Sequence, residues 1–159
     1  MLQARFDQPV RCIALRIILA AGMALGFPIA GYAQSKACPP AEAMTAETDA
    51  SSLKTWQAVF HSYNRYWRCD DGAIAEEYSD SVASLLAEHW DQFAELLTLT
   101  KKNPKFQAFV LRHINATMAS QQYTAIRQNV RSRCPSDARH LCRLINKRLS
   151  ETGLKGDED

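Results

Sequence analysis

The sequence predicts an all-α fold: a compact bundle of about five helices that follows a cleaved signal peptide and is held by two disulfides. Three observations point to this class. Large apolar residues recur at intervals of three and four, which is the period of an amphipathic helix. No stretch alternates apolar and polar side chains as a half-buried strand would. An even number of cysteines, four, remains once the leader is removed, which is typical of small exported domains with disulfides.

Residues 1–33 have the order of a secretory signal peptide. Three arginines in residues 1–16 precede an apolar run over 17–30, and small residues stand at Gly31 and Ala33. The apolar run is about 14 residues long, short of the roughly 20 that a helix needs to cross a bilayer. We therefore expect cleavage after Ala33 and export to the periplasm or out of the cell, with an uncleaved anchor as the alternative.

The exported chain is expected to divide into three parts. Residues 34–50 form an extended N-terminal arm, because the proline pair Pro39–Pro40 cannot lie inside a helix. Residues 51–150 form a single helical domain. Residues 151–159 form a flexible tail, because they have no apolar pattern.

The first two helices meet at the corner Cys69–Gly72. The first begins at a serine cap, Ser51 or Ser52. Its buried stripe consists of Leu53, Trp56, Phe60, Tyr63 and Trp67. The second begins at Asp70 or Asp71 and runs unbroken to Leu97, or kinks near His89–Trp90. Its buried stripe consists of Ile74, Tyr78, Val82, Leu85, Leu86, His89, Phe93 and Leu96.

Three further helices complete the predicted domain. The third begins at Asn103–Pro104, a cap followed by a proline at the first helical position. The fourth covers about 120–132 and ends before Cys134–Pro135. The fifth buries Ala138, Leu141, Cys142, Ile145 and Leu149.

Cys38, Cys69, Cys134 and Cys142 remain after Cys12 leaves with the signal peptide. Four cysteines allow three pairings, and we favour Cys38–Cys69 with Cys134–Cys142. The second pair needs a break in the helix, because eight helical residues span about 12 Å and the Cα atoms of a disulfide lie within about 7 Å. Pro135, with Ser136 as helix cap, would make that bend.

Charge is distributed unevenly along the chain. Residues 42–95 contain 11 acidic and three basic residues, whereas residues 101–148 contain 11 basic residues and one acid. We favour the interpretation in which the two halves pack together and neutralise each other. The alternative is an anion-binding face, for which the expected residues are Arg127, Arg131, Arg139, Arg143 and Lys147.

Catalytic and metal-binding signals are weak. His61, His89, His113 and His140 have no zinc-site spacing, and the sequence predicts no metal and no cofactor. His89 and Asp91 are weak candidates for a catalytic pair, because residues two apart on a helix point to different faces. These weak signals favour a protein that is not an enzyme.

These observations predict an exported, non-enzymatic protein that binds another macromolecule, for example an inhibitor or a toxin-immunity type of protein. The partner would be another protein or an anionic component of the envelope. Nucleic acid is not expected, and the chain would not span the membrane after cleavage. One alternative is a small envelope hydrolase or metal enzyme that uses His89, Asp91, His61 or His113. A second is a module that binds lipid headgroups or an anionic polymer through the fourth and fifth helices.

Overall fold

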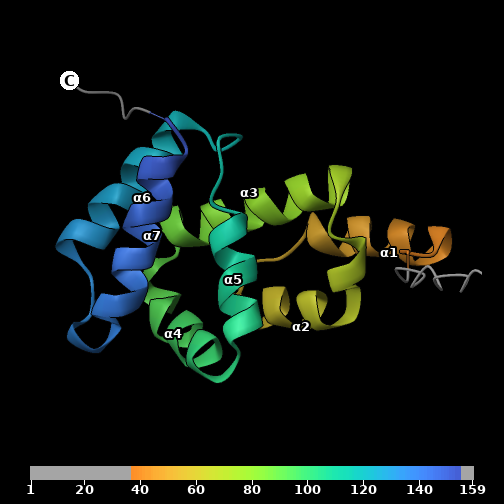
Figure 1. Ribbon diagram of the computed structural model, residues 1–159, viewed down its shortest axis with the longest axis horizontal. Helices are drawn as coiled ribbons and strands as arrows, with labels where there is room; N and C mark the ends of the chain where they lie inside the picture. The colour runs from red at the N-terminus through yellow and green to blue at the C-terminus, as the bar shows by residue number, and fades with distance from the viewer. Residues whose placement is uncertain (1–36, 155–159) are drawn as a thin grey trace, which may run out of the picture. The chain divides into compact units, whose positions relative to one another are not determined.

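Seven α-helices form the part of the chain that the computed structural model describes, residues 37–154 (Figure 1). This part contains no strand, so the predicted all-α class is confirmed, although the expected number of helices was too low. No helix within it is long and apolar enough to cross a membrane. The predicted signal peptide and residues 155–159 of the predicted tail lie outside the described residues.

Short 3₁₀ turns separate several of the helices. The helices are α1 (Pro40–Ala50), α2 (Trp56–Tyr66), α3 (Gly72–Glu88), α4 (Phe93–Lys102), α5 (Pro104–Arg112), α6 (Ser120–Ser132) and α7 (Arg139–Glu151). The 3₁₀ turns are η1 (Trp67–Cys69), η2 (Trp90–Gln92) and η3 (Ser136–Ala138).

The prediction of an extended arm over 34–50 is wrong from Pro40 onwards, where α1 begins. Pro39 is the N-cap residue and Pro40 the first helical residue, a position where a proline loses no hydrogen bond because the N–H groups of the first turn have no partner within the helix. Ala46 and Ala50 are fully buried. Small buried residues let α1 lie close to α3, where the Ser81 hydroxyl donates to the Ala50 carbonyl at 3.0 Å. The helical part therefore starts before residue 51, and α7 extends to Glu151.

The predicted second helix is broken, as the kinked alternative had it. α3 ends at Glu88, and His89 has a non-helical backbone with φ −115° and ψ 43°. Trp90 is buried and its indole N–H donates to the Arg133 carbonyl at 3.0 Å. This bond ties η2 to the end of α6 and turns α4 away from the axis of α3 (Figure 1).

The cap of α2 and the end of its stripe differ from prediction. Thr55, and neither of the two serines, accepts the Ala58 N–H at 3.2 Å. Trp67 is 58% exposed, because it lies in η1, where the helical period has ended. The predicted caps Asp71 of α3 and Asn103 of α5 are confirmed, since each side chain accepts a backbone N–H of the first turn.

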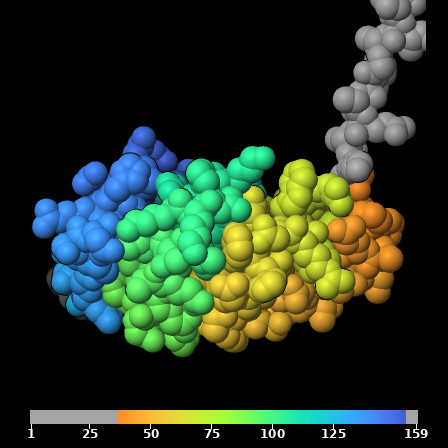
Figure 2. All heavy atoms as spheres, turned by 90° about the horizontal axis from the view of Figure 1, so that it is seen from below, coloured from red at the N-terminus to blue at the C-terminus, as the bar shows by residue number. Residues whose placement is uncertain are grey.

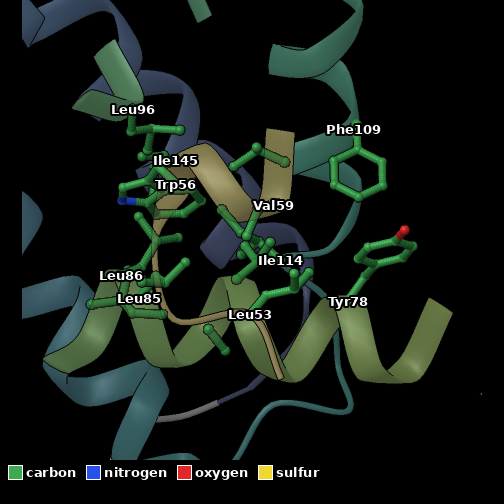
Figure 3. Packing of buried hydrophobic residues seen from close by; sticks show 14 of the residues in the cluster. Leu53, Trp56, Val59, Tyr78, Leu85, Leu86, Leu96, Phe109, Ile114 and Ile145 are labelled. Atoms are coloured by element: carbon green, nitrogen blue, oxygen red, sulfur yellow. The ribbon is translucent and has the colours of Figure 1, made fainter. Parts of the chain in front are cut away.

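The core lies along the buried face of α3, where side chains from most helices meet (Figure 3). α3 contributes Tyr78, Leu85 and Leu86, and α2 contributes Trp56 and Val59. The other labelled side chains are Leu53, Leu96, Phe109, Ile114 and Ile145. The Tyr78 and Phe109 rings form a T-shaped pair with 5.1 Å between centroids, a favourable aromatic arrangement.

Both predicted disulfides are present. The Cα atoms of Cys38 and Cys69 are 4.8 Å apart, and those of Cys134 and Cys142 are 6.3 Å apart. The second bridge forms because Pro135 is extended and η3 turns the chain before α7 begins. Ser136 makes no side-chain cap, so the proline and the 3₁₀ turn make the bend without the predicted cap.

Candidate functional site

A groove of about 630 Å³ lies along α7 beside the end of α6. Figure 1 shows these two helices side by side. The residues that line the groove are Val130, Arg131, Cys134, Arg139, Cys142, Arg143, Asn146, Lys147 and Ser150. We call this feature the α6–α7 groove. Four of the five residues predicted for a binding surface line it; Arg127 is not among the lining residues.

The helical period of α7 places two rows of side chains in the groove. Arg139, Arg143 and Lys147 are four residues apart and form a cationic row. Cys142, Asn146 and Ser150 form a second, neutral row, in which Cys142 and Asn146 directly precede Arg143 and Lys147 in the sequence. The α7 part of the groove therefore has charge along one side and small or neutral side chains along the other.

The arginines of the groove have no carboxylate partners in the described part of the chain. Arg131, Arg139 and Arg143 are exposed, and none forms an ion pair within residues 37–154. Lys147 lies 3.8 Å from Glu151, but its side chain is 74% exposed, and such pairs contribute about 0.3–0.5 kcal/mol. No described carboxylate competes for these guanidinium groups, which can therefore bind an external anion.

The acidic segment 42–95 and the basic segment 101–148 neutralise each other at one carboxylate among the described residues, Asp70. Arg112 and His113 are the only described residues of the basic segment that pair with an acid of the acidic segment. In Figure 2, α6 and α7 (blue) lie at the end of the described part opposite to α1 (orange). The acidic side chains of α1 are therefore too far away to neutralise the groove.

Asp70 is the centre of a buried polar network. Its side chain is 2% exposed and pairs with Arg112 and His113. His113 Nε2 lies 3.2 Å from Oδ1 and 3.3 Å from Oδ2, and only the contact with Oδ2 has hydrogen-bond geometry. Oδ1 has no hydrogen-bond partner among the described residues.

The network continues from His113 to Ser79. The Ser79 hydroxyl lies 3.0 Å from His113 Nδ1 and accepts from Asn115 Nδ2 at 2.9 Å. Asp70, His113 and Ser79 are the residue types of a hydrolase triad, but the contacts of the two ring nitrogens are exchanged: Asp70 contacts Nε2 and Ser79 contacts Nδ1. However, His113 is 3% exposed and Ser79 4%, so a substrate cannot reach the hydroxyl. The network joins the corner before α3 to the end of α5.

Two groups in this region have shifted pKa values. Burial alone would raise the pKa of Asp70, but the hydrogen bond and charge of His113, with the charge of Arg112, outweigh it and hold the pKa below the ordinary 3.8. Burial raises the pKa of Tyr78 to about 12, although the hydrogen bond with Ser62 opposes the shift. Asp70 is therefore an anion and Tyr78 a neutral phenol at physiological pH.

The other histidines do not assemble into a site with His113. His89 is half-buried at the end of α3, and Asp91 is exposed in η2. His61 and His140 are exposed on α2 and α7. Within residues 37–154, no three histidine, cysteine or acidic side chains are grouped so that they could hold a metal ion.

A second hollow, of about 380 Å³, lies beside α2. It is lined by Asp49, His61, Ser62, Asn64 and Arg65. His61 and Asp49 thus share an open hollow, yet no hydrogen bond or ion pair between described residues joins them. Nothing in the hollow orients the imidazole as a general base would require.

The sequence contained only part of the signal for these sites. It predicted the basic face of α7 from the spacing of its arginines. It did not predict the buried network, because Asp70 reads as a helix cap and its partner His113 is 43 residues away. The available signal was a serine and a histidine within apolar helical stretches. The chain matches no family model, no curated protein and no solved structure.

Proposed function

We propose that the chain is an exported, non-catalytic protein that binds another macromolecule through the α6–α7 groove, and that its partner presents negative charge there. An inhibitor or a toxin-immunity type of protein would act in this way. The observation that carries the proposal is a set of three guanidinium groups around one groove, none of which has a carboxylate partner within residues 37–154.

The energetics of the groove favour an anionic partner. Arg139 and Arg143 are one helical turn apart, and like charges at that spacing repel by about 0.2–0.5 kcal/mol. A carboxylate or phosphate between them removes the repulsion and accepts two-pronged hydrogen bonds from guanidinium. No acid of α7 precedes Glu151, so no carboxylate of the same helix offsets the repulsion between Arg139 and Arg143.

The cysteines support export. All four described cysteines form disulfides, which form and persist in oxidising compartments. The leader-like order of residues 1–33 points the same way. A partner outside the cytoplasm fits both features.

The hydrolase alternative has less support. His113 is beside a carboxylate but buried, and His89 and Asp91 face neither hollow. His61 lies in an open hollow with an acid, Asp49. Screening the purified protein against ester, amide and glycoside substrates addresses it; a turnover that His61→Ala removes would favour this alternative.

Titration with polyglutamate at several salt concentrations tests the proposed function. We expect binding that weakens steeply with salt, because exposed charges are screened over about 8 Å at physiological ionic strength. The double variant Arg139→Glu/Arg143→Glu should weaken binding by at least about tenfold. The control Lys54→Glu/Lys105→Glu makes the same change in net charge on exposed residues outside the groove, and should change binding by less than about twofold.

Equal losses in the two double variants would show attraction to net charge alone. Unchanged affinity for polyglutamate in both double variants would show that the groove does not bind it. Either result would contradict the proposed function.

A further inference from the structure

We propose that the segment bound in the α6–α7 groove is an acidic amphipathic helix of a partner protein, with carboxylates four residues apart facing Arg139, Arg143 and Lys147. This inference rests on the proposed function and names the partner's chemistry. It follows from three properties of the groove: its length, its floor and its backbone.

The length of the groove suits a helical ligand. The lining residues of α7 run from Arg139 to Ser150, about 16 Å along the axis at 1.5 Å per residue. Successive cations of the row are about 6 Å apart along the axis. Carboxylates at positions i, i+4 and i+8 of a second helix have the same spacing. Helices that pack at about 20° keep such rows in register over this length.

The groove offers apolar contact as well as charge. Of its lining residues, Val130 and Cys142 are 8% and 4% exposed, and both cysteines of the Cys134–Cys142 disulfide line it. We call these apolar residues the floor of the groove. A fully hydrophilic polyanion would desolvate this floor without filling it. An amphipathic segment places apolar side chains on the floor and its acids on the rim.

The backbone around the groove disfavours an extended peptide. The lining residues belong to α6, α7 and the turn between them. The N–H and C=O groups of a helix interior are already paired, so a strand that lay in the groove would find no edge for its own backbone. A helix satisfies its backbone internally, which leaves only side chains to be matched.

The cations are free to take a new partner. Arg139 and Arg143 form no ion pair among the described residues, and Lys147 has only its exposed pair with Glu151. Exchange of Glu151 for a partner carboxylate costs little, because exposed pairs are worth less than about 1 kcal/mol. Asn146 and Ser150 extend the groove with neutral donors, where the ligand would carry polar residues.

Two peptides of identical composition test the inference on the purified protein. Each has about 18 residues, long enough to be helical. The ordered peptide carries Glu at i, i+4 and i+8 with Leu at i+3 and i+7; the permuted peptide spreads the same residues around the helix. We expect the ordered peptide to bind at least about tenfold more tightly, as three exposed ion pairs would give.

The variants and two other probes make each outcome decisive. Arg139→Glu/Arg143→Glu should abolish the preference for the ordered peptide, whereas Lys54→Glu/Lys105→Glu should keep it. Arg139 and Arg143 are exposed, so both variants should fold, which their thermal unfolding midpoints will check. Polyphosphate and vesicles of phosphatidylglycerol with phosphatidylcholine serve as the alternative anions.

Equal binding of both peptides, lost in the Arg139→Glu/Arg143→Glu variant, would overturn the helical ligand and leave the proposed function standing. Tighter binding of vesicles or polyphosphate than of the ordered peptide would overturn the helical ligand in favour of a lipid surface or a polymer. No binding of any probe would overturn both.

Discussion

Asp70 shows how one buried charge ties two distant parts of the chain together. Its carboxylate is almost fully buried, and it holds His113 and Arg112 at the end of α5 against the corner that Cys69 anchors. A buried carboxylate that loses its partners is strongly destabilising, but one with cationic partners can be stabilising. The lowered pKa of Asp70 indicates the second case.

Substitution Asp70→Asn should lower the free energy of unfolding by about 2–3 kcal/mol at neutral pH, because the amide keeps the volume but loses the charge pairing. Chemical denaturation measures this loss. The neighbouring Asp71→Asn is the matched control. Asp71 is exposed and caps α3, and asparagine caps helices as well as aspartate, so little change is expected. Equal effects of the two substitutions would contradict the role given to Asp70.

The pH dependence of stability should identify the same carboxylate. A group whose pKa is lower in the folded state stabilises the fold above its unfolded pKa, and this contribution fades as the pH falls through the folded value. The wild type should therefore lose more free energy of unfolding between about pH 5 and pH 3 than Asp70→Asn does. Parallel curves for the two proteins would show that Asp70 contributes no such term.

Tyr78 and Ser62 form a second buried polar contact, with 2.7 Å between their hydroxyl oxygens. Tyr78→Phe should cost about 1 kcal/mol of stability, because Ser62 then lacks its partner. The double variant with Ser62→Ala should cost less than the sum of the single changes. Denaturation of the three variants measures the coupling; additive losses would show that the two hydroxyl groups do not stabilise each other.

Residue-level contacts were the least predictable part of the structure. His113 lies 34 residues from Ser79 and 43 residues from Asp70. The sequence explains Asp70 locally as a helix cap and His113 as part of an apolar stripe. Their contacts depend on how α3 and α5 pack, which local patterns do not contain. Arg139 and Arg143 were predictable as a surface, because their relative placement depends only on the helical period.

The helices were predictable where large apolar side chains set the period. The starts of α3 and α5 follow from Asp71 and Asn103, whose capping is a local property. α1 was missed because alanines form its contact with the core, and small residues give a weak apolar pattern. The break at His89 was predicted as one of two alternatives. The broken form is stabilised by Trp90, whose indole N–H donates to the carbonyl of Arg133 at the end of α6.

The two disulfides should differ in their effects on stability and on the groove. Cys38–Cys69 closes a longer loop, with a sequence separation of 31 against 8. On the chain-entropy account its removal by Cys→Ser at both positions should cost about 3–4 kcal/mol, against about 2–3 kcal/mol for Cys134–Cys142. Thermal unfolding compares the two variants.

The two disulfide variants should rank in the opposite order when their affinity for the acidic peptide is measured. Only Cys134 and Cys142 line the α6–α7 groove, so their replacement should weaken binding more. The Cys38→Ser/Cys69→Ser variant is the control for general loss of stability. A larger loss of binding in that variant would contradict the part assigned to the groove disulfide.

At the scale of the whole described part, charge is separated and not cancelled. Acidic residues are frequent on α1 and early α3, whereas α6 and α7 carry the arginines. Composition predicted this division, but the sequence could not tell whether the halves would meet. The structure brings them together at Asp70 and leaves the three arginines of the groove without an ion pair among the described residues. The basic groove is therefore the surface from which function is argued.

Mapping of the bound acidic peptide by NMR on the ¹⁵N-labelled protein tests this central claim most directly. Backbone amide shifts should change mainly over residues 130–150, at the end of α6 and along α7, and the changes should disappear in Arg139→Glu/Arg143→Glu. The amide chemical shifts of α1 and α2 should not change. Shifts that cluster on α1, α2 or the hollow beside His61, and leave α7 unchanged, would contradict the account.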